Sequence, residues 1–304
     1  MSEASPIESR CGFVALIGAP NVGKSTLLNA LVGTKVSIVT PKVQTTRALI
    51  RGIATEGAAQ LIFVDTPGIF APRRRLDRAM VGSARASMQD ADLVALLIDA
   101  RKGVTEDDDA ILKTFDEVRA AKVLILNKVD IAEKPALLAL TQKLNESGSF
   151  AATFMVSALT GDGVNDLKRW FAAHVPAGPW LYPEDQISDA PLRQLAAEIT
   201  REKLYLRLHQ ELPYQSTVET EVWKELKDGS VRIEQTIYVE RESQRKIVLG
   251  KAGQAIKAIG AAARTDIASA IEQPVHLFLH VKVREGWGED PERYREMGLE
   301  FPKE

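Results

Sequence analysis

Residues 18–25 read Gly-Ala-Pro-Asn-Val-Gly-Lys-Ser, and this stretch decides the fold of the first half of the chain. It matches the pattern G-x-x-x-x-G-K-[ST], in which glycines let backbone N–H groups turn inward around the phosphates of a nucleotide. In such a loop the Lys24 ammonium neutralises phosphate charge and the Ser25 hydroxyl ligates Mg²⁺. The stretch predicts a phosphate-binding loop with these contact residues: Gly18, Ala19, Pro20, Asn21, Val22, Gly23, Lys24, Ser25 and Thr26.

Two later motifs complete a nucleotide site and indicate which base it accepts. The first is Asp65-Thr66-Pro67-Gly68 and the second is Asn127-Lys128-Val129-Asp130. A carboxylate at Asp130 can accept hydrogen bonds from both N1–H and the exocyclic N2–H₂ of guanine, whereas adenine carries no donors at those positions. The motifs therefore predict a guanine-nucleotide site whose base specificity lies in Asp130.

Apolar runs alternate with helical patterns around these motifs. A helix is expected at 107–120, because Thr105 can cap it and acidic residues fill its first turn. Continuous apolar runs are typical of strands that are covered on both faces, so the βα repetition predicts a doubly wound, mainly parallel α/β sheet. In such a sheet the nucleotide lies at the carboxyl ends of the strands. The expected strands are 13–17, 61–64, 93–98, 123–126 and 154–156.

Composition limits the class of protein and its partners. The chain has 304 residues, enough for two domains, and no apolar run approaches the roughly 18 to 20 residues of a membrane span. Its 39 Lys and Arg residues stand against 41 Asp and Glu residues, so the net charge of −2 predicts no general attraction to nucleic acid or membrane. The single cysteine, Cys11, excludes an internal disulfide and a Cys-based zinc site. We expect a monomeric, cytoplasmic protein whose basic sites are local.

A change in composition separates two domains. Prolines and a glycine gather in residues 175–185, which is typical of a linker. We expect one domain at residues 1–178, a linker at about 175–190 and a second domain at residues 190–304.

The second domain is expected to follow the order α-β-β-α-α-β. Its two first strands are joined by a hairpin at Asp228-Gly229, and residues 246–249, apolar after Lys246, are expected to lead as a strand into a loop and a helix. The further elements are expected at 192–206 (helix), 216–226 and 231–240 (strands), 254–259 and 263–271 (helices), and 276–283 (strand).

Residues 250–253 read Gly-Lys-Ala-Gly, a G-x-x-G loop of the kind that clamps about four nucleotides of single-stranded RNA in KH domains. Alone, two glycines three residues apart are an ordinary turn. Here six basic residues stand between Arg241 and Arg264 against one acidic residue, Glu242, and basic side chains attract the phosphate backbone. The loop in this context predicts RNA binding by Arg241, Arg245, Lys246, Gly250, Lys251, Ala252, Gly253 and Lys257.

Motifs at both ends of the chain resemble the bacterial Era GTPase family, and the resemblance covers almost the whole sequence. It rests on the three nucleotide motifs and on three further stretches: Gln44-Thr45-Thr46-Arg47, Glu211-Leu212-Pro213-Tyr214 and Val239-Glu240-Arg241-Glu242. The resemblance implies a Ras-like P-loop GTPase domain followed by an α+β type II KH domain. It implies GTP, GDP and Mg²⁺ as ligands and the 3′ end of 16S ribosomal RNA and the small (30S) ribosomal subunit as partners. It also implies a role in assembly and maturation of that subunit and, as in some relatives, a peripheral association with the inner membrane.

The resemblance also implies roles for single residues. Asp65 is expected to reach Mg²⁺ through water, and the Gly68 N–H is expected to sense the γ-phosphate. Thr46 is expected to be the switch threonine on Mg²⁺, with Thr45 as the alternative. The Ser157-Ala158 backbone resembles the loop that reads guanine O6. The expected contact residues in these later motifs are Asp65, Gly68, Asn127, Lys128, Asp130, Ser157 and Ala158.

Hydrolysis poses a separate problem, because Ile69 stands where Ras proteins have the glutamine that positions the attacking water. An apolar side chain cannot orient water. Asn21 resembles the residue that ligates K⁺ beside the phosphates in relatives of this class, and the alternative is an asparagine that only shapes the loop. Arg73-Arg74-Arg75 is interpreted as a solvated charge run rather than an arginine finger. The residues expected to act in hydrolysis are Asn21, Lys24, Thr46, Asp65 and Gly68.

Two alternative functions are compatible with the nucleotide motifs. A tRNA-modification GTPase is disfavoured because this chain lacks a C-terminal cysteine and continues into the G-x-x-G domain. A nucleotide-gated RNA or membrane-surface adaptor with incidental hydrolysis would carry the same motifs. GTP hydrolysis measured with and without 30S subunits would separate that adaptor from an Era-like protein.

Overall fold

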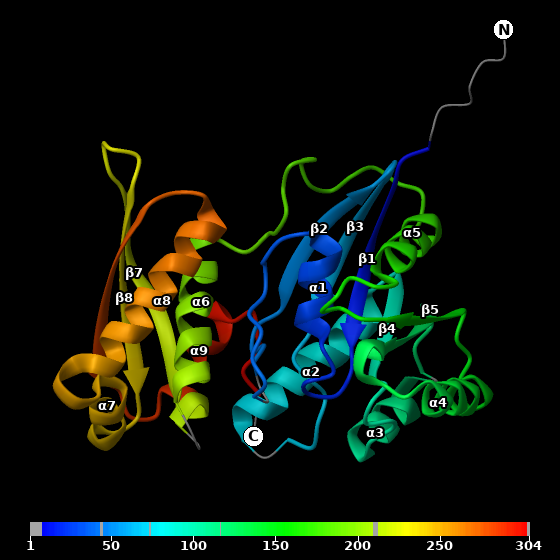
Figure 1. The fold of residues 1–304 in the computed structure, drawn as a ribbon, viewed down its shortest axis with the longest axis horizontal. Coiled ribbons are helices and arrows are strands. Elements are labelled where there is room, and N and C mark those ends of the chain that lie inside the picture. The colour runs from blue at the N-terminus through cyan, green and yellow to red at the C-terminus, as the bar shows by residue number, and fades with distance from the viewer. Residues whose placement is uncertain (1–7, 43–44, 73, 116, 209–211, 303–304) are drawn as a thin grey trace, which may run out of the picture. The chain divides into compact units, whose positions relative to one another are not determined.

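The computed structural model describes residues 8–42, 45–72, 74–115, 117–208 and 212–302 (Figure 1). The chain forms two compact units. The first contains the described residues up to 37, from 46 to 189 and from 298 onward, and the second contains Ile38–Thr45 and Ala190–Met297. Each unit therefore includes a short segment that is remote in sequence from the rest of it.

In the described residues, the first unit is built on a six-stranded sheet with the order β2-β3-β1-β4-β5-β6. All neighbouring pairs are parallel except β2 with β3, so the predicted mainly parallel sheet is confirmed. The strands are Arg10–Ile17 (β1), Ile50–Glu56 (β2), Ala59–Asp65 (β3), Leu93–Asp99 (β4), Ala121–Asn127 (β5) and Ala152–Val156 (β6). Each of the five strands expected from the sequence lies within one of them, and β2 was not predicted.

Helices cover both faces of this sheet. Along β1, Val14 and Leu16 pack into one buried cluster with α1 and α5, whereas Ala15 and Ile17 pack into another with α2, α3 and α4. Successive side chains of a strand point to opposite faces, so a strand that is apolar at every position serves both clusters. The helices are Lys24–Val32 (α1), Arg75–Asp90 (α2), Glu106–Phe115 (α3), Lys134–Ser147 (α4) and Val164–His174 (α5).

Two expectations for the first unit need correction. Helix α3 ends at Phe115 rather than at residue 120, because β5 begins at Ala121 and the chain has to turn before it. Thr105 does cap α3, because its hydroxyl accepts the Asp108 backbone N–H at 3.3 Å while the Asp108 carboxylate accepts the Thr105 N–H at 2.9 Å. Residues 175–189 group with the first unit instead of standing apart: the Ile53 N–H donates to the Ile187 carbonyl at 2.9 Å, which covers the edge strand β2.

The second unit has a three-stranded sheet, with β7 antiparallel and β9 parallel to the central β8 among the described residues. Its observed order is α6-β7-β8-α7-α8-β9, which confirms the predicted α-β-β-α-α-β order. A short helix, Pro291–Glu296 (α9), follows the last strand. The main elements are Leu192–Arg207 (α6), Ser216–Glu225 (β7), Val231–Val239 (β8), Glu242–Leu249 (α7), Gln254–Ile271 (α8) and Val275–Val283 (β9).

Some of the predicted elements of this unit were wrong. Residues 246–249 are the end of helix α7, not a strand, because Val248 packs on the apolar face that α7 shares with α6 and β8. The two short helices expected at 254–259 and 263–271 form one continuous helix, α8. Gly260 lies inside it without interrupting it, and a Cβ atom there would make an ordinary contact with Leu279 of β9 at 3.4 Å. No helix in the described part of the chain is both long and apolar enough to cross a membrane.

Candidate functional site

Parallel strands bring the nucleotide motifs to one edge of the first sheet. Leu16 of β1 lies opposite Asp65 of β3, and Asp99 of β4 lies opposite Asn127 of β5. The carboxyl ends of the strands therefore gather the phosphate-binding loop, the Asp65 motif and the Asn127 motif at a single site, as the sequence predicts.

The phosphate-binding loop connects β1 to α1 and depends on a glycine at position 23. Gly23 has a φ of +102°, and a Cβ atom there would lie 2.3 Å from the Asn127 amide nitrogen. Asn21 also has a left-handed backbone, with a φ of 64°. The Lys24 side chain is buried, and its ammonium donates to the carbonyls of Gly18 and Ala19, each at 3.0 Å. Burial lowers the pKa of Lys24 to about 8, although the nearby negative charge of Asp65 acts in the opposite direction and raises the pKa.

Three hydroxyl side chains meet at Asp65. Its Oδ2 accepts hydrogen bonds from Ser25 at 2.6 Å, Ser37 at 2.9 Å and Thr46 at 3.3 Å. Burial raises the pKa of the Asp65 carboxyl, while the Ser25 hydrogen bond and the Lys24 charge oppose that rise. Oδ1 is buried and has no hydrogen-bond partner among the described residues. Oxygen donors of this kind are the ones that Mg²⁺ prefers, and an orphan carboxylate oxygen beside two hydroxyls fits such an ion.

The two candidate threonines are placed differently. Thr46 Oγ1 lies 2.9 Å from Ser25 Oγ at the Asp65 cluster. Thr45 groups with the second unit, and its hydroxyl lies 2.6 Å from Thr40 Oγ1 and donates to the Lys42 carbonyl at 2.7 Å. Of the two, only Thr46 is brought to the Asp65 cluster.

Asn127 ties three loops of the site together. Its buried amide donates to the Val22 carbonyl at 2.8 Å and accepts from the Ala158 N–H at 3.0 Å. Lys128 donates to the Asn21 carbonyl at 2.7 Å and pairs with Asp99 at 2.7 Å. The Ser157-Ala158 loop is thus fixed beside the Asn127 motif, and the exposed Asp130 follows in a short turn, Val129–Ile131.

The segment after Asp65 approaches the phosphate-binding loop. A Cβ atom on Gly68 would lie 3.0 Å from Pro20, and the Ile69 N–H donates to the Gly18 carbonyl at 3.2 Å. The Ile69 side chain is buried in the cluster with α2 and α3, so it does not face the phosphates. Gln44, Arg73 and Glu211, which belong to the sequence motifs, lie outside the described residues.

Sequence reasoning missed two residues of this site. Ser37, which donates to Asp65, follows α1 without any recognisable motif. Asp99, the partner of Lys128, ends a buried strand in the same way as Asp65 and Asn127, so its position was a usable signal.

The G-x-x-G loop lies between α7 and α8 with an unusual backbone. Gly250, Ala252 and Gly253 all have positive φ angles, and a Cβ atom on Gly250 would lie 2.6 Å from the Ala255 Cβ. Lys251 and Ala252 are exposed, so the backbone N–H groups at the start of α8 can be reached by a phosphate.

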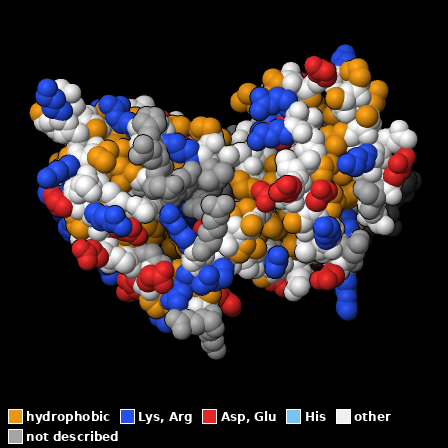
Figure 2. Space-filling model, turned by 90° about the horizontal axis from the view of Figure 1, so that it is seen from below, with side chains coloured by type: hydrophobic (Ala, Val, Ile, Leu, Met, Phe, Trp, Pro, Cys, Tyr) orange, Lys and Arg blue, Asp and Glu red, His pale blue; other side chains and the backbone are white. Residues whose placement is uncertain are grey.

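The basic residues around this loop differ in exposure and in the partners of their side chains. Arg241, Lys246 and Lys257 are exposed, whereas Arg245 pairs with Glu242 at 2.8 Å and donates to the Val281 carbonyl at 3.2 Å. The exposed Ile247 was missed because an apolar residue in a basic run reads as core. On the face that Figure 2 shows, basic and acidic side chains of the described residues are interspersed, which agrees with the net charge of −2.

Comparison with known proteins matches both units. The family model described as "50S ribosome-binding GTPase" matches residues 13–128, and the model described as "KH domain" matches residues 211–288. GTPase Era of Afipia carboxidovorans is 67% identical over 304 residues, which cover 100% of this chain and 99% of that protein. GTPase Era of Brucella suis biovar 1 is 67% identical over 300 residues, 99% of this chain and 96% of that protein.

Two solved structures are similar over nearly the same length. One is Era in complex with MgGDPNP and nucleotides 1506–1542 of 16S ribosomal RNA, with a TM-score of 0.90 and 38% identity over 95% of this chain and 99% of that chain. The other is an Aquifex aeolicus Era variant bound to GDP and AlF4⁻, with the same score, identity and coverage. Identity over the full length and the shared fold of both units show that the chain belongs to the GTPase Era family.

Proposed function

We propose that this GTPase binds the 3′ region of 16S ribosomal RNA through the loop at residues 250–253 and acts in assembly and maturation of the 30S subunit. The carrying observation is that the chain combines a nucleotide site in one unit with an exposed G-x-x-G loop in the other. The similar Era structure that contains MgGDPNP and 16S nucleotides supports the choice of RNA. We also propose that the first unit, with the residues from 298 onward, is the GTPase domain and that the second unit is the KH domain.

In the proposed site, two groups of residues divide the recognition of GTP. Lys24 and the N–H groups of the phosphate-binding loop hold the phosphates, because a desolvated ammonium gains strongly from a nearby anion. Asp130 accepts from the guanine N1–H and N2–H₂ groups. Asn127 holds the loops at the distance that a bound nucleotide requires, since its two hydrogen bonds join Val22 to Ala158.

Ser25, Thr46 and Asp65 are the residues proposed to hold Mg²⁺, with Asp65 acting through water. Bound there, the ion would neutralise charge that develops on the phosphates during transfer. Ser37 also donates to Asp65 Oδ2, and Oδ1, which has no hydrogen-bond partner among the described residues, is left to meet the ion's water.

We further propose that Asn21 holds a K⁺ ion that compensates for Ile69. The buried Ile69 side chain cannot orient the attacking water, so charge compensation beside the phosphates has to come from elsewhere. The left-handed backbone of Asn21 and the fixation of its carbonyl by Lys128 support a defined position for its side chain. Monomeric state, cytoplasmic location and peripheral membrane association stay predictions.

Binding of a single-stranded oligonucleotide with the sequence of the 16S 3′ end tests the RNA function. The variant Lys251→Asp/Ala252→Asp places two carboxylates in the loop and should abolish binding. The matched control Lys224→Asp/Lys227→Asp changes the net charge by at least as much on the exposed β7–β8 hairpin and should retain it. The affinity should also fall with added salt. A plot of the logarithm of the binding constant against the logarithm of the salt concentration should have a slope of about −0.7 for each phosphate neutralised.

GTP hydrolysis by the loop variant should equal that of the unmodified protein, because the substitutions lie outside the unit that holds the nucleotide motifs. Equal RNA binding by the unmodified protein, the loop variant and the control would show that residues 250–253 are only a turn.

A further inference from the structure

The C-terminal tail, here the described residues 298–302, belongs to the first unit although α9 just before it belongs to the second. Gly298 has a φ of +67°, so the chain turns sharply as it leaves α9. Leu299 is buried, with 4% of its surface exposed. The Arg75 guanidinium lies over the Phe301 ring, 5.0 Å from its centroid. The tail is therefore anchored at two points.

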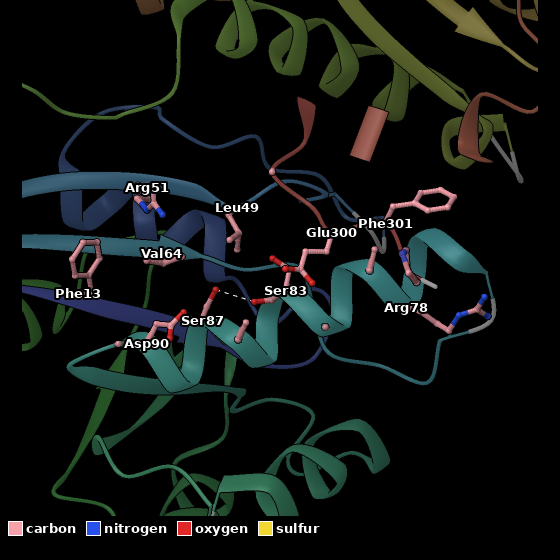
Figure 3. A pocket seen from close by; sticks show the side chains of 16 residues that line it. Phe13, Leu49, Arg51, Val64, Arg78, Ser83, Ser87, Asp90, Glu300 and Phe301 are labelled. Atoms are coloured by element: carbon pink, nitrogen blue, oxygen red, sulfur yellow. Dashed lines mark hydrogen bonds between the residues drawn. The ribbon is translucent and has the colours of Figure 1, made fainter. Parts of the chain in front are cut away.

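The tail forms one wall of a cavity of about 710 Å³ beside α2 (Figure 3). The opposite wall is a row of small α2 residues that includes Ala79, Gly82, Ser83 and Ala86. Figure 3 shows Phe301 toward the end of α2 that carries Arg78, away from Asp90 at the other end. A contact between the tail and α2 lies at the first turn of the helix, where the Arg75 guanidinium faces the Phe301 ring.

Residues 68–72, which we call switch II, precede that first turn in the sequence, and Arg73 between them lies outside the described residues. The turn is closed on itself, because the Asp77 carboxylate accepts the Arg74 N–H at 2.9 Å. At its other end switch II contacts the phosphate-binding loop through the Ile69 N–H and through Gly68 beside Pro20. Switch II is thus held at one end by the loop that binds phosphate and at the other by a turn that contacts the tail.

We propose that Phe301 is a positioning residue for switch II: acting through Arg75, it holds α2 where Gly68 lies against Pro20, and so favours GTP over GDP. The proposal rests on the assignment of Gly68 to the γ-phosphate. GDP has no γ-phosphate for the Gly68 N–H, so only the affinity for GTP depends on where switch II lies. By linkage, GTP binding strengthens the contact between the tail and α2 to the same extent.

The test compares the affinities of the full chain for GDPNP and GDP. A cation–π contact at a partly exposed site is worth about 0.5 to 1 kcal/mol, or a factor of about two to five in an equilibrium constant. Phe301→Leu keeps an apolar side chain but removes the ring, and should lower the preference for GDPNP over GDP by about two- to fivefold. Its GDP affinity should not change. Phe301→Tyr keeps the ring and should keep the preference.

Two further variants separate positioning from packing. Arg75→Gln should reproduce the loss seen in Phe301→Leu, and the double variant should lose no more than either single variant. Glu300→Gln, at the exposed neighbour of Phe301, should behave as the unmodified chain. If Phe301→Leu fails to fold, Arg75→Gln at the surface of α2 decides the question.

An unchanged preference for GDPNP over GDP in both Phe301→Leu and Arg75→Gln would overturn the proposal. Equal losses of GDP and GDPNP affinity would also overturn it, because they indicate a purely structural role. Failure of the unmodified chain to bind GDPNP would overturn the nucleotide site and the tail proposal together. Normal binding by the unmodified chain with no effect of the variants would overturn the tail proposal alone.

Discussion

Replacement of Asn127 by alanine should weaken both the fold of the first unit and its grip on nucleotide. The Asn127 amide is 1% exposed and makes two hydrogen bonds, to the Val22 carbonyl at 2.8 Å and from the Ala158 N–H at 3.0 Å. Val22 and Ala158 are themselves buried, so the variant leaves one acceptor and one donor without a partner. Each buried group left unsatisfied costs about 1–3 kcal/mol, which gives about 2–6 kcal/mol for the pair.

Two measurements check this expectation. Urea unfolding without nucleotide should show the loss of stability, and titration with a fluorescent GDP analogue should show an affinity at least about fivefold lower, because even one unsatisfied group costs about 1 kcal/mol. Asn145→Ala is the matched control, since the exposed Asn145 only accepts a hydrogen bond from Thr153. The control should change stability by less than about 0.5 kcal/mol. The reasoning fails if Asn127→Ala matches the control in both measurements.

Three other predictions concern single groups of the nucleotide site. Asp130→Asn should weaken GTP binding and shift preference toward xanthosine nucleotides, and unchanged GTP affinity would refute the assignment of Asp130. Replacing K⁺ by Na⁺ at constant ionic strength should lower the hydrolysis rate with little effect on GTP binding. The variant Asn21→Ala should hydrolyse GTP at the same rate in both salts. Equal rates of the unmodified chain in both salts would exclude the K⁺ site. Because burial lowers the pKa of Lys24 to about 8, and bound phosphate favours the charged form, GTP affinity should fall as pH rises from 7 to 8.5. The same titration of Lys24→Arg, whose side chain stays charged, should be flat; parallel profiles would contradict the role of Lys24.

The nucleotide site was predictable because its residues lie in short contiguous motifs. Gly23 and Lys24 belong to a loop whose backbone geometry dictates the residue types, and Asn127 ends a buried strand. Continuous apolar runs predicted the five covered strands in the same way. Edge strand β2 escaped because its sequence mixes apolar residues with Arg51 and Thr55, so no periodicity marks it.

Contacts between segments that are distant in sequence were not predictable. Ser37 reaches Asp65 only after the sheet has formed, and Arg75 meets Phe301 from the other end of the chain. Helix α7 was missed because its three last residues, Ile247 to Leu249, are apolar in succession and resemble a strand. Only the packing of Val248 against α6 and β8 shows that the segment is helical.

The account's central claim is that one chain joins a GTPase site to an RNA-binding loop, and we predict from it that the nucleotide state controls RNA binding. The most direct measurement is the affinity of the unmodified protein for an oligonucleotide with the sequence of the 16S 3′ end, with saturating GDPNP and with saturating GDP, at one salt concentration. The account predicts tighter binding with GDPNP, by a factor within the range of about 5–150 that is usual for coupled sites. Equal affinities in the two nucleotide states would contradict it, even if GTP hydrolysis and RNA binding were each observed separately.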